Sequence, residues 1–229
     1  MSYTKQESLV EFDGWSRTYD ASILQRILFV PSHDYLMSAI SDGEQRPVRA
    51  LDIGCGTGVF ARRMAATYRD AEVWGVDFSG QMVGQAAART SGSAPTIRYV
   101  QADSESLPLA SNSFDVITCS NSFHHYPNQA AAVHEMYRVL RPGGRLLIID
   151  GYRDRLWGRF IFDVCVVAME GEVHHASARR FRELFHGAGF TSVRQQARLG
   201  LAPFLLTSGT AHKGSAMSMP TTQSPRIAA

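Results

Sequence analysis

The sequence has few cysteines and little net charge, and each shortage excludes a class of protein. Its three cysteines, Cys55, Cys119 and Cys165, are odd in number, lie far apart and form no C-x-x-C pair. We therefore expect reduced thiols rather than a disulfide framework. The formal net charge of +2 is too small to indicate a nucleic-acid-binding surface, so we expect no nucleic-acid partner.

Long apolar runs are also missing. The longest of note, residues 161–169, is short and contains Asp163, so we predict no membrane span. The polar stretch MSYTKQESLV lacks the apolar core of a signal peptide, which favours a cytoplasmic protein. With 229 residues, 45% hydrophobic and 19% charged, the chain suits one larger soluble domain or one domain with appendages.

The middle of the chain alternates apolar strands with amphipathic helices. We predict strands over 48–54, 72–78, 97–103, 114–122 and 145–150, and helices over 58–70, from Ser79, over 128–140 and over 177–190, before a closing strand pair. Such alternation predicts right-handed βαβ units and an α/β fold, with a mostly parallel sheet covered by helices on both faces.

Three segments fall outside this alternation. Residues 1–45 look mostly helical and precede the main domain, which we place at 46–211. Residues 151–176 form an apolar insertion that we expect to cap the edge where the parallel strands end, the edge at which ligands bind in such sheets. Residues 212–229 are rich in Ser, Thr and Pro and are expected not to fold.

Three glycines in five positions, within LDIGCGTGVF at 51–60, follow the first strand and open the first helix. Glycine permits tight turns and lets a ligand touch the main chain, and a helix start offers unpaired N–H groups. A tight turn without a ligand is the alternative. Because position 59 is Val59, the dinucleotide fingerprint G-x-G-x-x-G is incomplete, which favours a mononucleoside over NAD.

Two acidic residues follow at the ends of the next strands. Asp77 is placed to accept hydrogen bonds from two ribose hydroxyls. Asp103 is placed to accept from an exocyclic amino group such as adenine N6, with Phe78 and Met82 forming an apolar slot for the purine. Each residue taken singly is also compatible with ordinary packing, but their order describes an adenosine-shaped site.

The motifs LDIGCGTG, GVDFSGQMV, QADSESLPLASNSFDVITC and EMYRVLRPGGRLLIID resemble the successive motifs of class I S-adenosylmethionine-dependent methyltransferases. The resemblance covers residues 48–150 and is closest to the ubiquinone/menaquinone C-methyltransferases and the small-molecule O-methyltransferases of natural-product pathways. It implies a Rossmann-like, seven-stranded sheet whose last strand is antiparallel, with S-adenosylmethionine as cofactor and S-adenosylhomocysteine as product. RTYD at 17–20 resembles an N-terminal motif of this branch near the methionine end of the cofactor. The cofactor contacts that we expect are Tyr19, Asp52, Gly54, Cys55, Gly56, Gly58, Asp77, Phe78, Met82, Asp103, Ser104 and Ser120.

The acceptor side should be built by the segment after the fourth strand, SNSFHHYP. An imidazole is suited to take a proton at neutral pH, so His125 or His124 is our candidate base, with Asp150 orienting it or acting itself. The pair could instead only shape the pocket. We predict no metal, because adjacent histidines tend to point apart and no third ligand has suitable spacing. A second pair, His174 and His175, closes the pocket or lies exposed in a loop.

The leading interpretation is methyl transfer to O or C of a small, ring-containing organic acceptor. The alternatives are a protein methyltransferase and a fold relative that binds the cofactor without transferring methyl, such as a cyclase or a regulatory binder. Base-amine methylation is disfavoured because NSFHHYP is not the Asp/Asn-Pro-Pro-aromatic motif of those enzymes. The sequence leaves open a homodimer.

Overall fold

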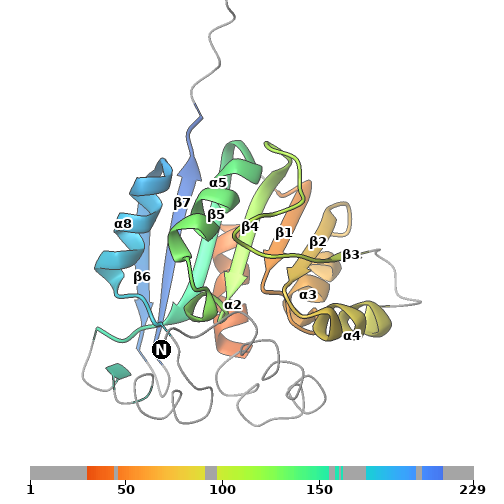
Figure 1. The fold of residues 1–229 in the computed structure, drawn as a ribbon, viewed down its shortest axis with the longest axis horizontal. Helices are drawn as coiled ribbons and strands as arrows, with labels where there is room; N and C mark the ends of the chain where they lie inside the picture. Colours follow the sequence, from red (N-terminus) through yellow and green to blue (C-terminus); the bar gives the residue numbers. More distant parts are fainter. Residues whose placement is uncertain are drawn as a thin grey trace, which may run out of the picture.

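Seven strands form one mixed β-sheet in the order β3-β2-β1-β4-β5-β7-β6 (Figure 1). The computed structural model describes residues 30–43, 46–90, 97–154, 158–159, 161, 174–199 and 203–213. The strands are β1 (Arg49–Ile53), β2 (Glu72–Asp77), β3 (Ile97–Gln101), β4 (Phe114–Ser120), β5 (Leu140–Gly151), β6 (Phe190–Arg198) and β7 (Phe204–Ala211).

The first five strands pair in parallel, and β7 runs antiparallel to both of its neighbours. The α/β architecture, the seven strands and the antiparallel last strand are thereby confirmed. The carboxyl ends of the parallel strands meet at the lower edge of the sheet in Figure 1.

Helices cover both faces of the sheet, as predicted. They are α2 (Val30–Ser41), α3 (Val59–Thr67), α4 (Gly80–Thr90), the 3₁₀ turn η3 (Phe123–His125), α5 (Gln129–Val139) and α8 (Ala178–Ala188). Val133 of α5 and Phe181 of α8 belong to the core on the face seen in Figure 1. Leu36 of α2 and Met64 of α3 belong to a second core. The sheet is therefore buried between two apolar layers.

The ends of two helices follow from local sequence. The side chain of Asn128 accepts from the amide of Ala131 at the start of α5, and Ser177 accepts from Arg180 at the start of α8. Asn and Ser are preferred at this position because their oxygens satisfy an otherwise unpaired N–H group. Gly189 ends α8 in the left-handed conformation, with φ 99°.

One strand begins earlier than predicted. The sequence placed the fifth strand at 145–150, after the stop signal RPGG, but β5 begins at Leu140, directly after α5. Leu140 pairs with Phe114, and a register shift between Phe114 and Val116 follows. The stop signal thus marks the end of the helix, but no loop separates the helix from the strand.

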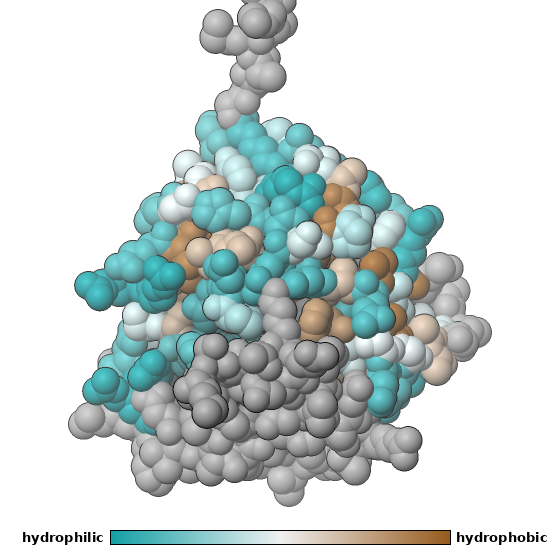
Figure 2. All heavy atoms as spheres, viewed as in Figure 1, coloured by the Kyte–Doolittle hydropathy of each residue, from teal (hydrophilic) through white to brown (hydrophobic). Residues whose placement is uncertain are grey.

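Several predicted segments lie outside the described residues. They are residues 1–29 of the N-terminal segment, which include Tyr19, most of the insertion at 151–176, which includes Cys165, and the tail from 214. In the described ranges no helix is both long and apolar enough to cross a bilayer. On the face shown in Figure 2, the described apolar residues form small separate patches among polar ones.

Candidate functional site

The loop between β1 and α3 holds the three glycines in left-handed conformations, with φ 70° at Gly54, 51° at Gly56 and 77° at Gly58. A Cβ atom at Gly54 would overlap the Ser122 side chain and approach the Tyr126 hydroxyl at 2.8 Å. At Gly56, by contrast, no described atom lies within 4 Å of an added Cβ. Packing thus requires glycine at 54, whereas the described residues leave room for a ligand against the main chain at 56.

Asp77 fixes this loop from the tip of β2. Its Oδ2 accepts from the amide of Gly56 at 2.7 Å, and its Oδ1 accepts from the amide of Ser79 at 2.9 Å. Burial raises the pKa of Asp77 above its ordinary value, against the lowering effect of the Ser79 and Gly56 amides. A carboxylate has about four acceptor positions, so capacity remains for the hydroxyls of a ligand.

Asp52 lies inside the sheet, 2% exposed. The Thr118 hydroxyl on β4 donates to its Oδ1 at 2.8 Å. Burial raises the pKa of Asp52 to about 7, although the Thr118 hydrogen bond lowers it. Asp52 therefore links β1 to β4 directly below the glycine loop.

The expected purine slot lies at the neighbouring strand tips. The amide of Ala102 donates to the carbonyl of Asp77 at 3.0 Å, which places the end of β3 beside the end of β2. Asp103 is half-buried and its Oδ1 accepts from the Glu105 amide at 2.9 Å. Met82 is buried at the start of α4, whereas Phe78 and Ser104 are half-buried. The structure thus brings these four residues and Asp77 to one edge of the sheet.

Ser120 and the described cysteines lie on or beside the strands that carry the site. Ser120, at the end of β4, accepts from Asn121 Nδ2 at 3.0 Å, and the same Nδ2 donates to Ser32 of α2 at 2.7 Å.

Cys55 and Cys119 are buried free thiols. Burial raises the pKa of both, that of Cys119 to about 12, so neither is a thiolate nucleophile at neutral pH.

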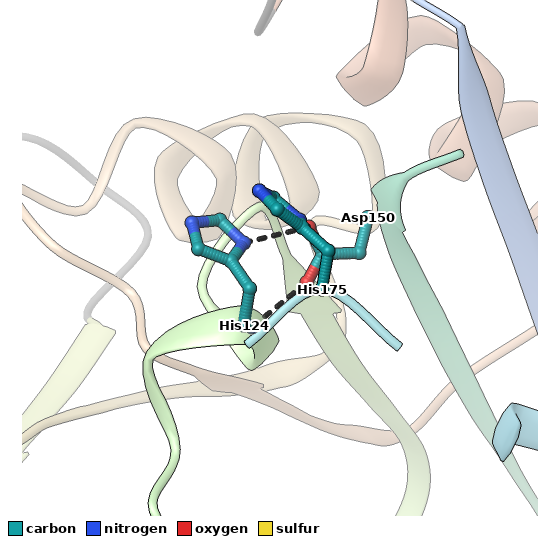
Figure 3. Close-up of side chains that lie close together, drawn as sticks. All are labelled: His124, Asp150 and His175. Carbon is teal, nitrogen blue, oxygen red and sulfur yellow. Dashed lines mark hydrogen bonds and ion pairs between the residues drawn. The ribbon is translucent and has the colours of Figure 1, made fainter. Parts of the chain in front are cut away.

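His124, in η3, and Asp150, near the end of β5, form a buried pair (Figure 3). His124 Nδ1 lies 2.7 Å from Asp150 Oδ1, and the His124 amide donates to Asp150 Oδ2 at 2.9 Å. Burial by itself would raise the pKa of Asp150, but the charges and hydrogen bonds of His124 and His175 hold it below its usual range. A carboxylate in this position orients the imidazole through Nδ1.

His125 lies beside the His124 ring. It is half-buried, and the two ring centroids are 4.1 Å apart with the ring planes tilted by 46°. Burial, and then the proximity of His124, hold the pKa of His125 well below its ordinary value. Of the two histidines that the sequence offered as base, His124 is the one hydrogen-bonded to the carboxylate of Asp150.

The residue that sequence reasoning left undecided is His175. It lies just before α8, is 6% exposed, and its Nδ1 is 3.7 Å from Asp150 Oδ1. Its neighbour His174 is exposed. The argument against a metal depended on the lack of a third ligand at suitable spacing, and the fold supplies His175 from a distant segment. The second HH pair was the only signal for it.

A cavity of about 460 Å³ opens beside this cluster. The described residues that line it are Arg153, Asp154, Arg159 and Ser177. Arg153 also donates to the carbonyl of His175 at 3.1 Å, so the wall of the cavity is continuous with the histidine segment.

Known proteins resemble this chain in sequence and in fold. Residues 51–148 match a family model described as a methyltransferase domain. Over 107 residues the chain is 35% identical to the demethylmenaquinone methyltransferase of Thermus thermophilus, a match that covers 47% of this chain and 49% of that protein. The match therefore spans about half the length of this relative.

Two solved structures share the fold. A methyltransferase of Haloferax volcanii, solved in complex with the activator Trm112, aligns with a TM-score of 0.74 at 19% identity, covering 90% of this chain and 98% of that one. Magnesium protoporphyrin IX methyltransferase of Synechocystis PCC 6803, solved with bound S-adenosylhomocysteine, aligns with a TM-score of 0.69 at 18% identity, covering 88% and 94%.

Proposed function

This chain carries a class I S-adenosylmethionine-dependent methyltransferase domain, and on that premise we propose that it methylates a hydroxyl oxygen of a small, ring-containing organic acceptor. The observation that carries the proposal is the buried His124–Asp150 pair, with Nδ1 and Oδ1 2.7 Å apart. It lies at the same strand edge as the glycine loop, because Asn121, three residues before His124, donates its amide to Ile149 of β5.

The cofactor site is proposed at the glycine loop and the two acidic strand tips. The open space at Gly56 and the remaining acceptor capacity of Asp77 fit a nucleoside, with Asp103, Ser104, Met82 and Phe78 on the side of the base. Gly54, Cys55 and Gly58 shape the loop, and Asp52 and Ser120 support it from β1 and β4. When bound, S-adenosylmethionine supplies an electrophilic methyl group on a sulfonium.

The acceptor is proposed to lie over η3 and the end of β5. Asp150 holds the His124 ring through Nδ1, so that Nε2 takes the proton of the acceptor hydroxyl while the oxygen becomes the nucleophile. A positioned base of this kind contributes roughly 10²–10⁴-fold to the rate. Burial of His124 and Asp150 keeps water away from the reacting oxygen.

Two further points support this choice of acceptor. The name of the Thermus thermophilus relative points to a menaquinone precursor, a ring-containing molecule. The buried imidazole–carboxylate pair fits an oxygen nucleophile, because a hydroxyl becomes a strong nucleophile when it loses its proton. The polar cavity at Arg153 and Ser177 offers room for the rest of the acceptor.

The test is S-adenosylhomocysteine release from S-adenosylmethionine with a panel of phenols, quinols and sugars. We expect turnover with at least one hydroxyl acceptor, with the methyl group on oxygen by NMR, and a loss of roughly 10²-fold or more in H124Q. His134, exposed on α5, supplies the matched control H134A, which should retain full turnover. Turnover of H124Q equal to that of the native chain would refute the base assignment, and a C-methylated product would refute the oxygen assignment.

A further inference from the structure

We propose that His124, Asp150 and His175 form a binding site for a divalent transition-metal ion, with Zn²⁺ as the best match. Each side chain offers one ligand atom, and the three atoms lie within 4.8 Å of one another. All three residues are buried, with exposures of 6% for each histidine and 2% for Asp150. Imidazole nitrogen and carboxylate oxygen are the usual non-sulfur ligands of zinc.

Two of the three distances between the ligand atoms lie near the value that a zinc ion requires. Zinc bonds to nitrogen and oxygen are about 2.0–2.1 Å long and tetrahedral, which separates neighbouring ligand atoms by about 3.3 Å. From Asp150 Oδ1, the Nδ1 atom of His124 lies at 2.7 Å and that of His175 at 3.7 Å. Changes of about 0.6 Å and about 0.4 Å, within the range of side-chain rotation, bring both to that distance, and the third separation, between the two histidine nitrogens, is within 4.8 Å.

Hydrogen bonds outside the three ligands hold them in place. The amide of Gly151 donates to Asp150 Oδ1 at 2.7 Å, and the amide of His124 donates to Oδ2 at 2.9 Å. The carbonyl of His175 accepts from Arg153 at 3.1 Å. Metal sites typically carry such outer contacts, because they orient the ligands before the ion binds.

A second buried imidazole at the same carboxylate distinguishes a metal site from a general base with its orienting carboxylate. A general base and its orienting carboxylate need only one histidine. The rings of His124 and His175 lie 4.3 Å apart between centroids and come from different chain segments, yet both turn Nδ1 toward Asp150. Two histidines and one carboxylate leave a fourth zinc position open for water or a hydroxyl.

The ion and the proposed base use the same imidazole ring of His124, the ion through Nδ1 and the base through Nε2. An ion on His124 Nδ1 displaces the hydrogen bond to Asp150, and the ring then carries its proton on Nε2. The metal-bound form and the His124 base of the proposed function therefore exclude each other, and in the metal-bound form the fourth ligand would be a water whose pKa the ion lowers. The site is argued from the geometry of the three residues and does not depend on methyl transfer.

The test is a titration of the purified full chain, freed of metal by EDTA and dialysis, with Co²⁺. We expect one equivalent to bind, with the visible absorption of a four-coordinate ion, and Zn²⁺ to displace it. H175Q should weaken Co²⁺ binding at least about tenfold, since even outer-shell changes cost that much. H134A is the matched control and should bind as the native chain does.

No Co²⁺ binding by the native chain, or equal binding by native and H175Q chains, would overturn the proposal. X-ray absorption of the native zinc complex gives a second readout that needs no variant. We expect nitrogen and oxygen neighbours, including two imidazoles, and a sulfur neighbour would contradict the site. Neither measurement uses S-adenosylmethionine or an acceptor, so failure of the metal site leaves the methyltransferase proposal standing, whereas a bound ion would exclude His124 as its base.

Discussion

The main-chain amide of His174 donates a 2.8 Å hydrogen bond to the carbonyl of His124. This contact fastens the segment before α8 to the 3₁₀ turn η3. It thereby sets His175 beside the carboxylate of Asp150. Gln129, at the start of α5, strengthens the junction, because its Nε2 donates to the carbonyl of His174 at 2.8 Å and approaches that of Phe123 at 3.4 Å.

Loss of the Gln129 side chain should loosen this junction. We expect Q129A to lower the free energy of unfolding by about 0.5–1.5 kcal/mol, the usual contribution of such a hydrogen bond. Co²⁺ affinity should also fall, because His175 is held less firmly. Urea unfolding and the Co²⁺ titration measure the two effects. An unchanged Co²⁺ affinity would mean that the His174 contact alone positions His175.

The glycine loop gives a matched pair of variants. G54A combines a left-handed backbone with an overlap on Ser122, whereas G56A carries only the left-handed conformation, which costs about 1–2 kcal/mol. We expect G54A to be the more destabilised of the two in urea unfolding. Equal losses in G54A and G56A would show that the Ser122 side chain moves aside without cost.

A third glycine predicts the opposite effect. Gly84 lies in the interior of α4, where no described atom lies within 4 Å of an added Cβ. G84A should therefore raise the free energy of unfolding by about 0.5–1 kcal/mol, measured in the same urea experiment.

His33 should make stability depend on pH. Burial, and then the charge of Arg63, lower the pKa of His33 to about 4, while Asp34 acts in the opposite direction. The unfolded chain, with a histidine pKa of about 6.5, therefore binds more protons than the folded chain between these values. The His33 contribution to stability is thus lost as the pH falls from about 6.5 to about 4, by about 3 kcal/mol in all.

The measurement is the difference in unfolding free energy between native and H33F chains across this pH range. His33 packs against Phe60 with centroids 4.9 Å apart, so a phenyl ring keeps the apolar contact. The unfolding free energy of H33F should rise relative to that of the native chain as the pH falls. The raised pKa of Asp52, about 7, also makes stability fall as the pH rises from about 4 to 7. Both chains contain Asp52, so its contribution cancels in the difference between their unfolding free energies. A difference that does not change with pH would place the folded pKa of His33 near its ordinary value.

The fold was predictable because its signals are local. Apolar periodicity marks each strand and helix, and Asp77 is recognisable as the last residue of a strand that follows a glycine loop. His175 was not predictable in the same way. Its distance from Asp150 depends on how α8 docks on the sheet and on the His174–His124 contact, and neither follows from spacing in the sequence.

Two local details also escaped prediction. Asn121 adopts φ 51°, a left-handed conformation that non-glycine residues seldom take, and its side chain bridges Ser120 to Ser32 of α2. The early start of β5 at Leu140 depends on pairing with Phe114, a contact between distant segments. Sequence patterns indicate which residues form a strand, but pairing decides where it begins.

The cofactor assignment is tested most directly by calorimetric titration of the purified chain with S-adenosylhomocysteine. We predict saturable binding to the native chain and binding roughly 10–100-fold weaker in D77A, because loss of charged hydrogen bonds costs about 1.5–3 kcal/mol. Asp70, exposed in the turn before β2, supplies the control D70A, which should bind as the native chain does. No heat of binding with the native chain, or equal affinity in native and D77A chains, would contradict the site at the glycine loop and Asp77.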